Sequence, residues 1–406
     1  MNVDPGRLHG SSYDVVIVGA GIMGSATAYQ LTKKAPELKI LLLEQYGFGH
    51  RRGSSHGSSR IIRKSYHESY YCKMMRKSFD LWHQAEREAN TRVISMTGGI
   101  DFVKKGTMIE KKLKRAMEEA EVAFQELDKE ELVSRFPGFS MPDHFTSFYS
   151  EDAGVVNASK ACALFQNLAR THGAELAEEV KLESVLEDNA REGEKSVTIC
   201  TSAGEIKCRK LIFTAGPWNQ KLLNHCFGLD LKMKSLNTTV VYWRCKDPSS
   251  RVYAAPGCPV FIAYSDDDRC LNAYGTPAME YPGLVKFCLH SGYEQDPDNR
   301  LCIPNLEDID RKLKEMTRTF LPHVDSSNHV MAEACMYTNT LDDNFVLDFL
   351  PGRTSKNIIV GAGFSGHGFK FGPLIGDILS DLALGSKLEF SLEPFRIGRL
   401  IHQGSA

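Results

Sequence analysis

Two apolar runs that end in glycines stand near the two ends of the chain. Near the N-terminus, residues 15–18 read Val-Val-Ile-Val and lead into Gly19, Gly21 and Gly24 with the spacing G-x-G-x-x-G. An uninterrupted apolar run predicts a buried strand, and the pattern after the glycines predicts a helix. Such a strand, turn and helix can hold a pyrophosphate, because glycines let the backbone approach it and the helix N-terminus offers free N–H groups. Residues 39–44 predict a second parallel strand that ends in Glu44, where a ribose-binding acid is expected.

The second run, residues 357–360, leads into Gly361, Gly363, Gly366 and Gly368. No strand ending in an acid follows it, so this segment is not a repeat of the first fingerprint. Its predicted helix N-terminus, with Lys370 just inside, could support an electron-rich ring atom instead of a phosphate. We therefore expect one cofactor-binding unit assembled from both ends of the chain. The glycine pattern by itself does not choose between NAD and FAD.

The pattern between these runs predicts a mixture of helices and strands. Apolar spacing favours helices over residues 61–88, 110–127, 158–172 and 308–320, and strands over 99–103, 210–218, 238–243, 259–264 and 284–290. The prediction is an α/β fold of two domains. A dinucleotide-binding domain takes residues 1–90, 147–228 and 328–406, and a β-rich domain takes 91–146 and 229–327. Asp266–Asp268 is interpreted as an exposed turn, not as a metal site.

Composition narrows the class of protein. The chain has 406 residues, 42% of them apolar, and a formal net charge of −2, which gives no reason to expect nucleic acid as a partner. Its 11 cysteines include no C-x-x-C pair, which argues against a zinc site or a disulfide framework and suits a reducing compartment. No signal peptide or membrane span is expected. The last residues, Gly404-Ser405-Ala406, do not match an S-K-L address.

Four further motifs carry a family resemblance. They are Gly53-Ser54-Ser55-His56-Gly57-x-x-Arg60-Ile61-Ile62-Arg63-Lys64, Tyr281-Pro282-Gly283-Leu284-x-Lys286, Cys335-Met336-Tyr337-Thr338-Asn339-Thr340 and Gly363-Phe364-Ser365-Gly366-His367-Gly368-Phe369-Lys370. Together they resemble the sarcosine oxidase family of flavoenzymes over nearly the whole chain, especially its eukaryotic sarcosine/pipecolate oxidases. The resemblance implies a Rossmann-like FAD-binding domain and a β-rich substrate domain, as in glutathione reductase and D-amino acid oxidase.

The resemblance also implies the cofactor and its contacts. FAD would be attached through its 8α-methyl carbon to the sulfur of Cys335, although a lone cysteine is more commonly a buried structural residue. His56 and Arg60 match residues beside the isoalloxazine, where positive charge favours the reduced flavin. The remaining cofactor contacts would be Gly19, Gly21, Gly24, Glu44, Ser54, Ser55, Tyr337, Gly363, Phe364, Gly366, His367 and Lys370.

Substrate residues follow from the same resemblance. Arg63 and Lys370 match the pair that binds the substrate carboxylate, a role that suits a guanidinium fork and a compact ammonium. Lys286 matches the lysine that promotes reaction with O₂, since a fixed ammonium stabilises developing superoxide. Tyr274 and His290 match pocket residues. The loop between Tyr274 and Lys286 is one residue longer than in the bacterial pattern, which leaves Tyr274 the least secure match.

The implied reaction is oxidation of a secondary α-amino acid, such as sarcosine, L-pipecolate or L-proline, to an imine, with O₂ reduced to hydrogen peroxide. One alternative is a flavin-dependent dehydrogenase that uses another electron acceptor. Another is an NAD-dependent dehydrogenase or a non-catalytic nucleotide-binding module with the same glycine turn. The resemblance further implies a monomer and a peroxisomal location, with the cytoplasm as the alternative.

Overall fold

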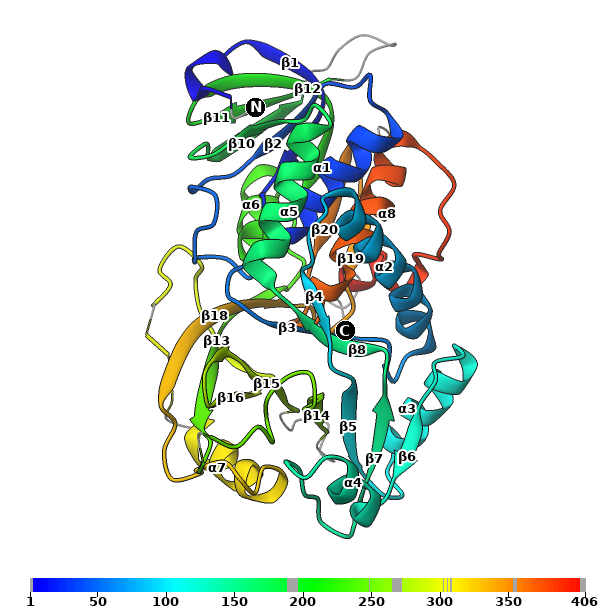
Figure 1. Cartoon of the computed structure of the whole chain (residues 1–406). Coiled ribbons are helices and arrows are strands. Elements are labelled where there is room, and N and C mark those ends of the chain that lie inside the picture. Colours follow the sequence, from blue (N-terminus) through cyan, green and yellow to red (C-terminus); the bar gives the residue numbers. More distant parts are fainter. Residues whose placement is uncertain are drawn as a thin grey trace.

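The chain folds around two large β-sheets that lie at opposite ends of the molecule (Figure 1). The structure is a computed structural model that describes residues 3–187, 196–247, 249–264, 272–301, 303–304, 306, 309–352 and 356–401. The turn expected at Asp266–Asp268 lies outside the described residues. The two sheets correspond to the two kinds of layer that the sequence predicts, a largely parallel one and an antiparallel one.

The first sheet has eight strands and a parallel centre. Its central strand β1 pairs in parallel with β2 and β12, β2 pairs with β9, and β12 pairs with β20. Helices α1, α5 and α8 pack beside one another against this sheet (Figure 1). The bounds are β1 (Ser11–Val18), β2 (Ile40–Leu43), β9 (Glu175–Ala177), β10 (Leu182–Glu187), β11 (Val197–Thr201), β12 (Gly204–Phe213), β19 (Val346–Phe349), β20 (Ile358–Ala362), α1 (Ile22–Lys34), α5 (Ala158–Thr171) and α8 (Gly372–Leu384).

The apolar runs at both ends of the sequence account for this sheet. All four residues of 15–18 are buried, as expected for a parallel strand covered by helices on its faces. Strand β20, formed by the second run, lies two places from β1, so the ends of the chain do meet in one sheet. The α/β fold class and both predicted strands are confirmed.

The second sheet has nine strands and is mostly antiparallel. Its order is β17-β13-β16-β15-β14-β5-β7-β6, with β18 on the other side of β13. Large aromatic side chains, among them Phe102, Trp243, Phe261 and Phe287, form its core. The bounds are β5 (Gly99–Lys104), β6 (Gln125–Leu127), β7 (Phe145–Ser150), β13 (Lys234–Arg244), β14 (Val260–Ala263), β15 (Ala273–Tyr281), β16 (Leu284–Leu289), β17 (Gly292–Glu294), β18 (Met331–Asn339), α3 (Met108–Glu119), α4 (Lys129–Arg135) and α7 (Ile309–Phe320).

A small three-stranded sheet lies between the two large ones (Figure 1). Strand β8 (Ala153–Val156) pairs with both β3 (Arg60–Arg63) and β4 (Ile94–Met96). The helix predicted over residues 61–88 is therefore wrong at its start, since helix α2 spans only Ser69–Glu88. Two adjacent β-branched residues, Ile61 and Ile62, suit an extended strand better than a helix.

Two other predictions need comment. The helix predicted over residues 110–127 ends at Glu119, and residues 125–127 form β6 instead. The predicted division into domains stays a prediction, but two of its boundaries cut across the sheets. Strands β7 and β18 hydrogen bond within the nine-stranded sheet, although residues 147–228 and 328–406 were assigned to the cofactor-binding domain.

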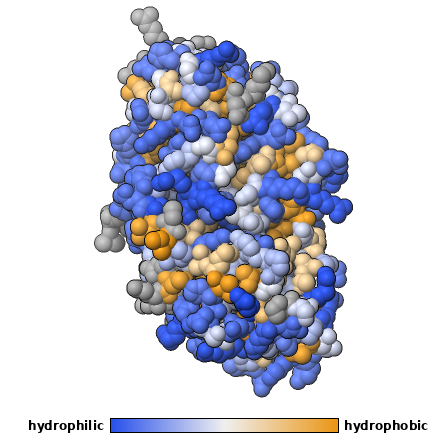
Figure 2. All heavy atoms as spheres, turned by 60° about the vertical axis from the view of Figure 1, so that its left-hand side comes forward, coloured by the Kyte–Doolittle hydropathy of each residue, from blue (hydrophilic) through white to orange (hydrophobic). Residues whose placement is uncertain are grey.

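The remaining short elements lie in the connections. They are α6 (Asn219–Phe227), α9 (Gly398–Ile401) and the 3₁₀ turns Pro5–Arg7, Gly216–Trp218, Phe369–Phe371 and Glu393–Phe395. On the face drawn in Figure 2, hydrophilic residues cover most of the surface and hydrophobic ones form small separate patches. Among the described helices, none combines the length and apolar character that crossing a bilayer requires.

Candidate functional site

The glycine turn after β1 has the close approaches that its sequence predicts. Gly19 has a φ of +99°, and a Cβ there would lie 2.7 Å from the carbonyl oxygen of Thr214. A Cβ on Gly24 would lie 2.0 Å from the carbonyl oxygen of Gly19. Side chains at these positions are therefore excluded by backbone atoms of the turn itself and of the neighbouring strand.

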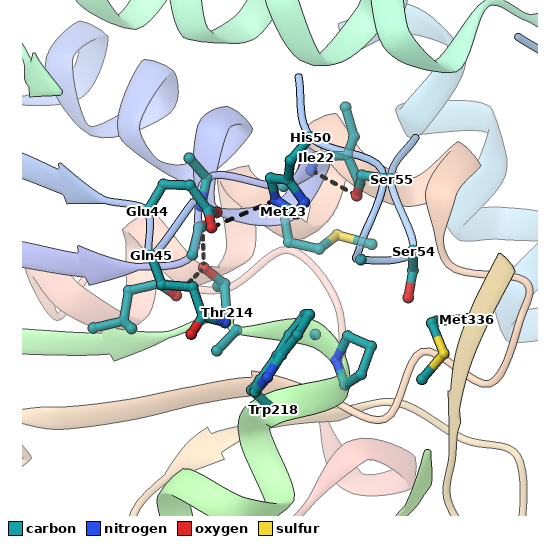
Figure 3. A pocket seen from close by; sticks show the side chains of 18 of the residues that line it. Ile22, Met23, Glu44, Gln45, His50, Ser54, Ser55, Thr214, Trp218 and Met336 are labelled. Atoms are coloured by element: carbon teal, nitrogen blue, oxygen red, sulfur yellow. Dashed lines mark hydrogen bonds and ion pairs between the residues drawn. The ribbon is translucent and has the colours of Figure 1, made fainter. Parts of the chain in front are cut away.

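Figure 3 shows what surrounds this turn. Helix α1 begins at Ile22, whose N–H donates to Oγ of Ser55 at 3.1 Å. Glu44 follows β2, and its carboxylate accepts hydrogen bonds from the N–H groups of Ala20 (3.0 Å) and Tyr46 (3.1 Å). The predicted acid thus lies beside the glycine turn. Ser55, from the loop between residues 43 and 60, contacts the N-terminus of helix α1.

A cavity of about 720 Å³ extends from this turn toward the middle of the molecule. Its wall includes Glu44, Trp218, the loop residues Ser54, Ser55 and His56, and the C-terminal glycine segment. The volume falls in the range of cofactor sites. The excluded Cβ positions, the helix N-terminus and the buried Nε2 of His56, which has no hydrogen-bond partner among the described residues, fit a dinucleotide such as FAD.

A second cavity of about 280 Å³ adjoins the first. Four residues, Arg60, Tyr337, Gly366 and Phe369, line both cavities. The second one also contains most of the predicted catalytic and substrate residues, Arg63, Tyr274, Lys286, His290 and Lys370, together with the predicted cofactor contacts Cys335 and His367. The structure therefore brings together residues that lie more than 300 positions apart in the chain, at the junction of a large and a small cavity.

Cys335 is a buried thiol beside two basic side chains. Sγ of Cys335 lies 3.6 Å from Nη2 of Arg60. Burial raises the pKa of this thiol, but the Arg60 charge and the nearby His56 imidazole outweigh burial and lower the pKa to about 6. For comparison, burial raises the pKa of the neighbouring Cys288 to about 11. Cys335 is thus the thiol poised to act as a nucleophile at neutral pH.

Lys286 is held in a buried polar cluster on β16. Its Nζ donates to Oγ (3.0 Å) and to the backbone O (3.3 Å) of Ser59 and lies 3.4 Å from Oε1 of Glu280. Glu280 also accepts hydrogen bonds from Ser59 and, at 2.8 Å, from the Tyr242 hydroxyl. Burial raises the pKa of Glu280, but Lys286 and the two hydroxyl donors outweigh burial and lower it. The ammonium is therefore fixed and faces an ionised carboxylate.

Arg63 and Lys370 also line the small cavity. Nη1 of Arg63 is 3.3 Å from Oδ1 of Asp101 and donates to Oγ of Ser65 at 2.9 Å. Nζ of Lys370 donates to the Tyr66 hydroxyl (2.7 Å) and the backbone O of His367 (2.8 Å). Burial and the nearby Arg63 charge hold the pKa of Lys370 well below its usual value. Lys370 lies in the 3₁₀ turn before α8 and not inside a helix as predicted.

The aromatic wall of the small cavity contains Tyr274, His290, Tyr337 and His367. The Tyr274 and Tyr337 hydroxyls are 3.4 Å apart, so Tyr274 does lie in the cavity. Burial and the Lys370 charge lower the pKa of His290 to about 4 and hold that of His367 far below its usual value. Both imidazoles are neutral at pH 7. The segment that carries Tyr274 shifts register against β16 between Thr276 and Tyr281, where the additional loop residue is expected.

The C-terminal glycine segment is shaped by close packing. Gly363 and Gly366 have φ values of +60° and +73°. A Cβ on Gly366 would lie 2.6 Å from Cε1 of His290, and the Phe364 ring packs against Phe345 with centroids 5.2 Å apart. The backbone O of Lys370 accepts hydrogen bonds from Ser78 (2.7 Å) and from Trp82 Nε1 (2.8 Å). Helix α2 thus fixes the segment that carries Lys370.

Five residues of the site are not predicted from the sequence: Ser59, Tyr66, Asp101, Tyr242 and Glu280. Four of them contact a predicted cation directly, and the fifth, Tyr242, donates a hydrogen bond to Glu280. Ser59 and Glu280 lie beside quoted motifs, but Asp101 and Tyr242 lie in strands where a polar residue gives no local signal of its partner. Among the described residues, no group of three or more His, Cys, Asp or Glu side chains could hold a metal ion.

Comparisons with known proteins agree with this geometry. The family model described as "FAD dependent oxidoreductase" matches residues 14–382. The chain is 39% identical to a "Probable sarcosine oxidase" of Arabidopsis thaliana, over 92% of this chain and 88% of the relative. It is 37% identical to a "Peroxisomal sarcosine oxidase" of Homo sapiens, over 97% and 98% of the two chains. The solved structure of NikD, described as an unusual amino acid oxidase, has a TM-score of 0.79 and 22% identity, covering 95% and 97%.

The lowered pKa of Lys370 predicts how a carboxylate ligand binds. A carboxylate binds the protonated ammonium better, so the affinity for acetate should fall as the pH rises through the pKa of unliganded Lys370. Isothermal titration calorimetry of the holoenzyme from pH 6 upward measures this, with a slope of up to about tenfold per pH unit. Lys370→Met should weaken binding and abolish the slope, whereas the control Lys64→Met, at a partly buried lysine that lines neither cavity, should keep it. A slope that persists in Lys370→Met would assign the titration to another group.

Proposed function

The chain belongs to the sarcosine oxidase family of FAD-dependent oxidoreductases, and from this premise we propose the details of its reaction. It is a flavin-dependent amine oxidoreductase that oxidises secondary α-amino acids. The observation that carries the assignment of a carboxylate-bearing substrate is the pairing of Arg63 and Lys370 in one enclosed cavity, adjoining the cavity with the dinucleotide turn. A nucleotide-binding module without catalysis has no use for the second cavity.

In the proposed mechanism, residues of the small cavity bind the substrate carboxylate and surround the substrate amine. Arg63 and Lys370 bind the substrate carboxylate, because they supply a fork and a point charge in a buried site. Tyr274, His290 and Tyr337 surround the amine and exclude water. Since His290 stays neutral at pH 7, it adds no positive charge beside an amine that must lose its own proton. This environment orients the reacting C–H and favours the uncharged amine.

The bound FAD would accept the equivalent of a hydride from the substrate and pass the electrons to O₂, giving an imine and hydrogen peroxide. Lys286 supports the oxidase alternative over a dehydrogenase with another acceptor. Its ammonium is already desolvated and fixed by Ser59 and Glu280, so it stabilises a developing negative charge without reorganisation.

We further propose that Cys335 carries FAD through a thioether. What supports this is the depressed pKa of the thiol together with its place in the wall of the small cavity, next to Arg60, which lines both cavities. The further residues proposed to contact FAD are His56, Arg60, Glu44, Ser54, Ser55, Tyr337, Gly363, Phe364, Gly366 and His367. All of them line the larger cavity except His367, which lines the small one. The partners proposed are one small amino acid, O₂ and no second chain. The peroxisome is the location that the human relative's name supports.

A peroxide assay tests the function directly. Purified protein is given sarcosine, L-pipecolate, L-proline and a primary amino acid such as alanine, and hydrogen peroxide is measured. Peroxide from at least one secondary amino acid, well above that from alanine, is the expected result. Substrate-dependent bleaching of the flavin without peroxide would favour the dehydrogenase, and no spectral change with any secondary amine would overturn the proposed function.

Covalent attachment is tested by acid precipitation. The wild-type pellet should stay yellow, whereas Cys335→Ala should give a colourless pellet, because the mutant has no sulfur in the right place to bond the 8α carbon. Cys288→Ala is the matched control: it is also buried and lies in the same sheet on β16, separated from β18 by β13, but its pKa is raised. A colourless wild-type pellet from a yellow solution would remove the covalent link without excluding bound FAD.

The role of Lys286 is tested by rapid kinetics. Lys286→Met keeps the length and burial of the side chain but removes the charge, so flavin reoxidation by O₂ should slow by at least about 100-fold, in keeping with the loss of one preorganised electrostatic group. Reduction of the flavin by substrate, measured anaerobically in a stopped-flow instrument, should change much less. Equal losses in both half-reactions would contradict the proposed role.

A further inference from the structure

The lining of the small cavity reaches the molecular surface at two short loops. One carries His67 and Glu68, and the other is the segment 341–344 between β18 and β19, the entrance loop. Asp342 and Asp343 of the entrance loop line the cavity and are exposed, and Asn344 lines it from a partly buried position. Because the larger cavity is the proposed FAD site, a ligand that enters the small cavity from solvent passes the entrance loop.

The inner side of the entrance loop is held by hydrogen bonds between uncharged groups. Oδ1 of Asn344 accepts from the hydroxyls of Tyr70 (2.7 Å) and Tyr71 (3.1 Å), which both belong to α2. The backbone O of Asp343 lies 3.0 Å from Nε2 of His367. These contacts connect the entrance loop to α2 and to the C-terminal glycine segment.

A charged side chain, Arg399 of α9, holds the outer side of the entrance loop. Its guanidinium contacts both carboxylate oxygens of Asp342, with Nε 2.8 Å from Oδ2 and Nη2 3.2 Å from Oδ1. Nη2 also donates to the backbone O of Asn344 at 2.6 Å. A planar guanidinium that binds a carboxylate and a carbonyl together fixes the direction of the loop. Arg399 itself lines neither cavity.

The segment that carries Arg399 is anchored by other contacts. The side chains of Ile397 and Leu400 are buried. Nη1 of Arg396 lies 2.7 Å from Oδ1 of Asp348, and Oδ2 of Asp348 accepts the N–H of Ile397 at 3.0 Å. Because these contacts hold α9 independently of the Arg399 guanidinium, the contacts of Arg399 act on the entrance loop.

We infer that Arg399 is a positioning residue that fixes the width of the entrance to the small cavity and thereby selects substrates by size. This inference rests on the proposed function, in which the small cavity binds the amino acid. A small substrate such as sarcosine passes the loop while both of its sides are held. A bulky substrate displaces the loop and must break the contacts with Arg399, so these contacts lower its affinity and leave that of a small substrate unchanged.

The test compares a small and a bulky carboxylate in Arg399→Gln, which removes the charge and the fork. Acetate and indole-3-acetate are titrated into the holoenzyme by isothermal titration calorimetry. Affinity for indole-3-acetate relative to acetate should rise about tenfold, the lower end of the range for one hydrogen bond to a charged group, because the Arg399–Asp342 pair is partly exposed. The ratio of kcat/KM for N-benzylglycine to that for sarcosine should rise similarly, while the rate of flavin reduction at saturating sarcosine stays the same.

Two further variants separate the entrance from the rest of the fold. Arg396→Gln is the matched control, because it removes the same charge from the same segment, at an ion pair with Asp348 whose two residues line neither cavity; it should leave both ratios unchanged. Asp342→Asn removes the other partner of Arg399, so the double variant with Arg399→Gln should add little to either single change. Parallel changes for the small and the bulky ligand in Arg399→Gln, or equal shifts of the ratio in Arg396→Gln, would overturn the inference.

The outcome is separable from the proposed function, because the calorimetric ratio needs no turnover. A shifted ratio in a protein that forms no peroxide from any secondary amine would refute the reaction but support the role of Arg399. Peroxide formation with an unchanged ratio would do the opposite.

Discussion

The site depends on keeping several positive charges out of water between two sheets. A buried ammonium or guanidinium is unfavourable unless an anion or several acceptors compensate for its lost hydration. The structure meets this requirement with a different partner for each cation: a carboxylate for Lys286, a carboxylate for Arg63, and a thiol and backbone carbonyls for Arg60. Among the residues that the structure describes, Lys370 donates only to neutral acceptors, and burial together with the nearby Arg63 charge lowers its pKa.

These pairings connect the small sheet to the nine-stranded sheet. Arg60 and Arg63 lie on the small sheet, whereas Lys286, Glu280 and Cys335 lie on the nine-stranded sheet. Asp101 reaches Arg63 from β5, and Tyr66 reaches Lys370 from the loop before α2. Arg60, Arg63 and Lys370 are thus each compensated in part by a residue from another part of the chain, and Lys286 donates to Ser59 as well as to Glu280 of its own hairpin. The charges are stable only when the elements that carry their partners are in place.

The sequence predicted the larger features of this arrangement because they are local. The turn at Gly19–Gly24 and the apolar runs on either side of it determine a strand, a close approach and a helix within about thirty residues. The cations that the family motifs predict as site residues, Arg60, Arg63, Lys286 and Lys370, all line the small cavity. In contrast, Asp101 could not be recognised, because nothing near β5 in the sequence indicates that Arg63 will lie beside it. Glu280 was missed for a related reason: it lies in the stretch where β15 shifts register, and only the folded hairpin directs it toward Lys286. The sequence predicts a helix where β3 lies, because four residues are too few to show the alternation of apolar and polar positions that identifies a strand.

The contact between Arg60 and Cys335 links the two cavities electrostatically. While the sulfur is a thiolate, it compensates the Arg60 charge at 3.6 Å. In the proposed thioether the sulfur carries no charge, so Arg60 loses its anion but stays buried in the wall that both cavities share. A buried cation without a counterion stabilises any negative charge that develops nearby. If Cys335 forms the proposed thioether, the same bond that would hold the cofactor would also leave the Arg60 charge without its anion, beside both cavities.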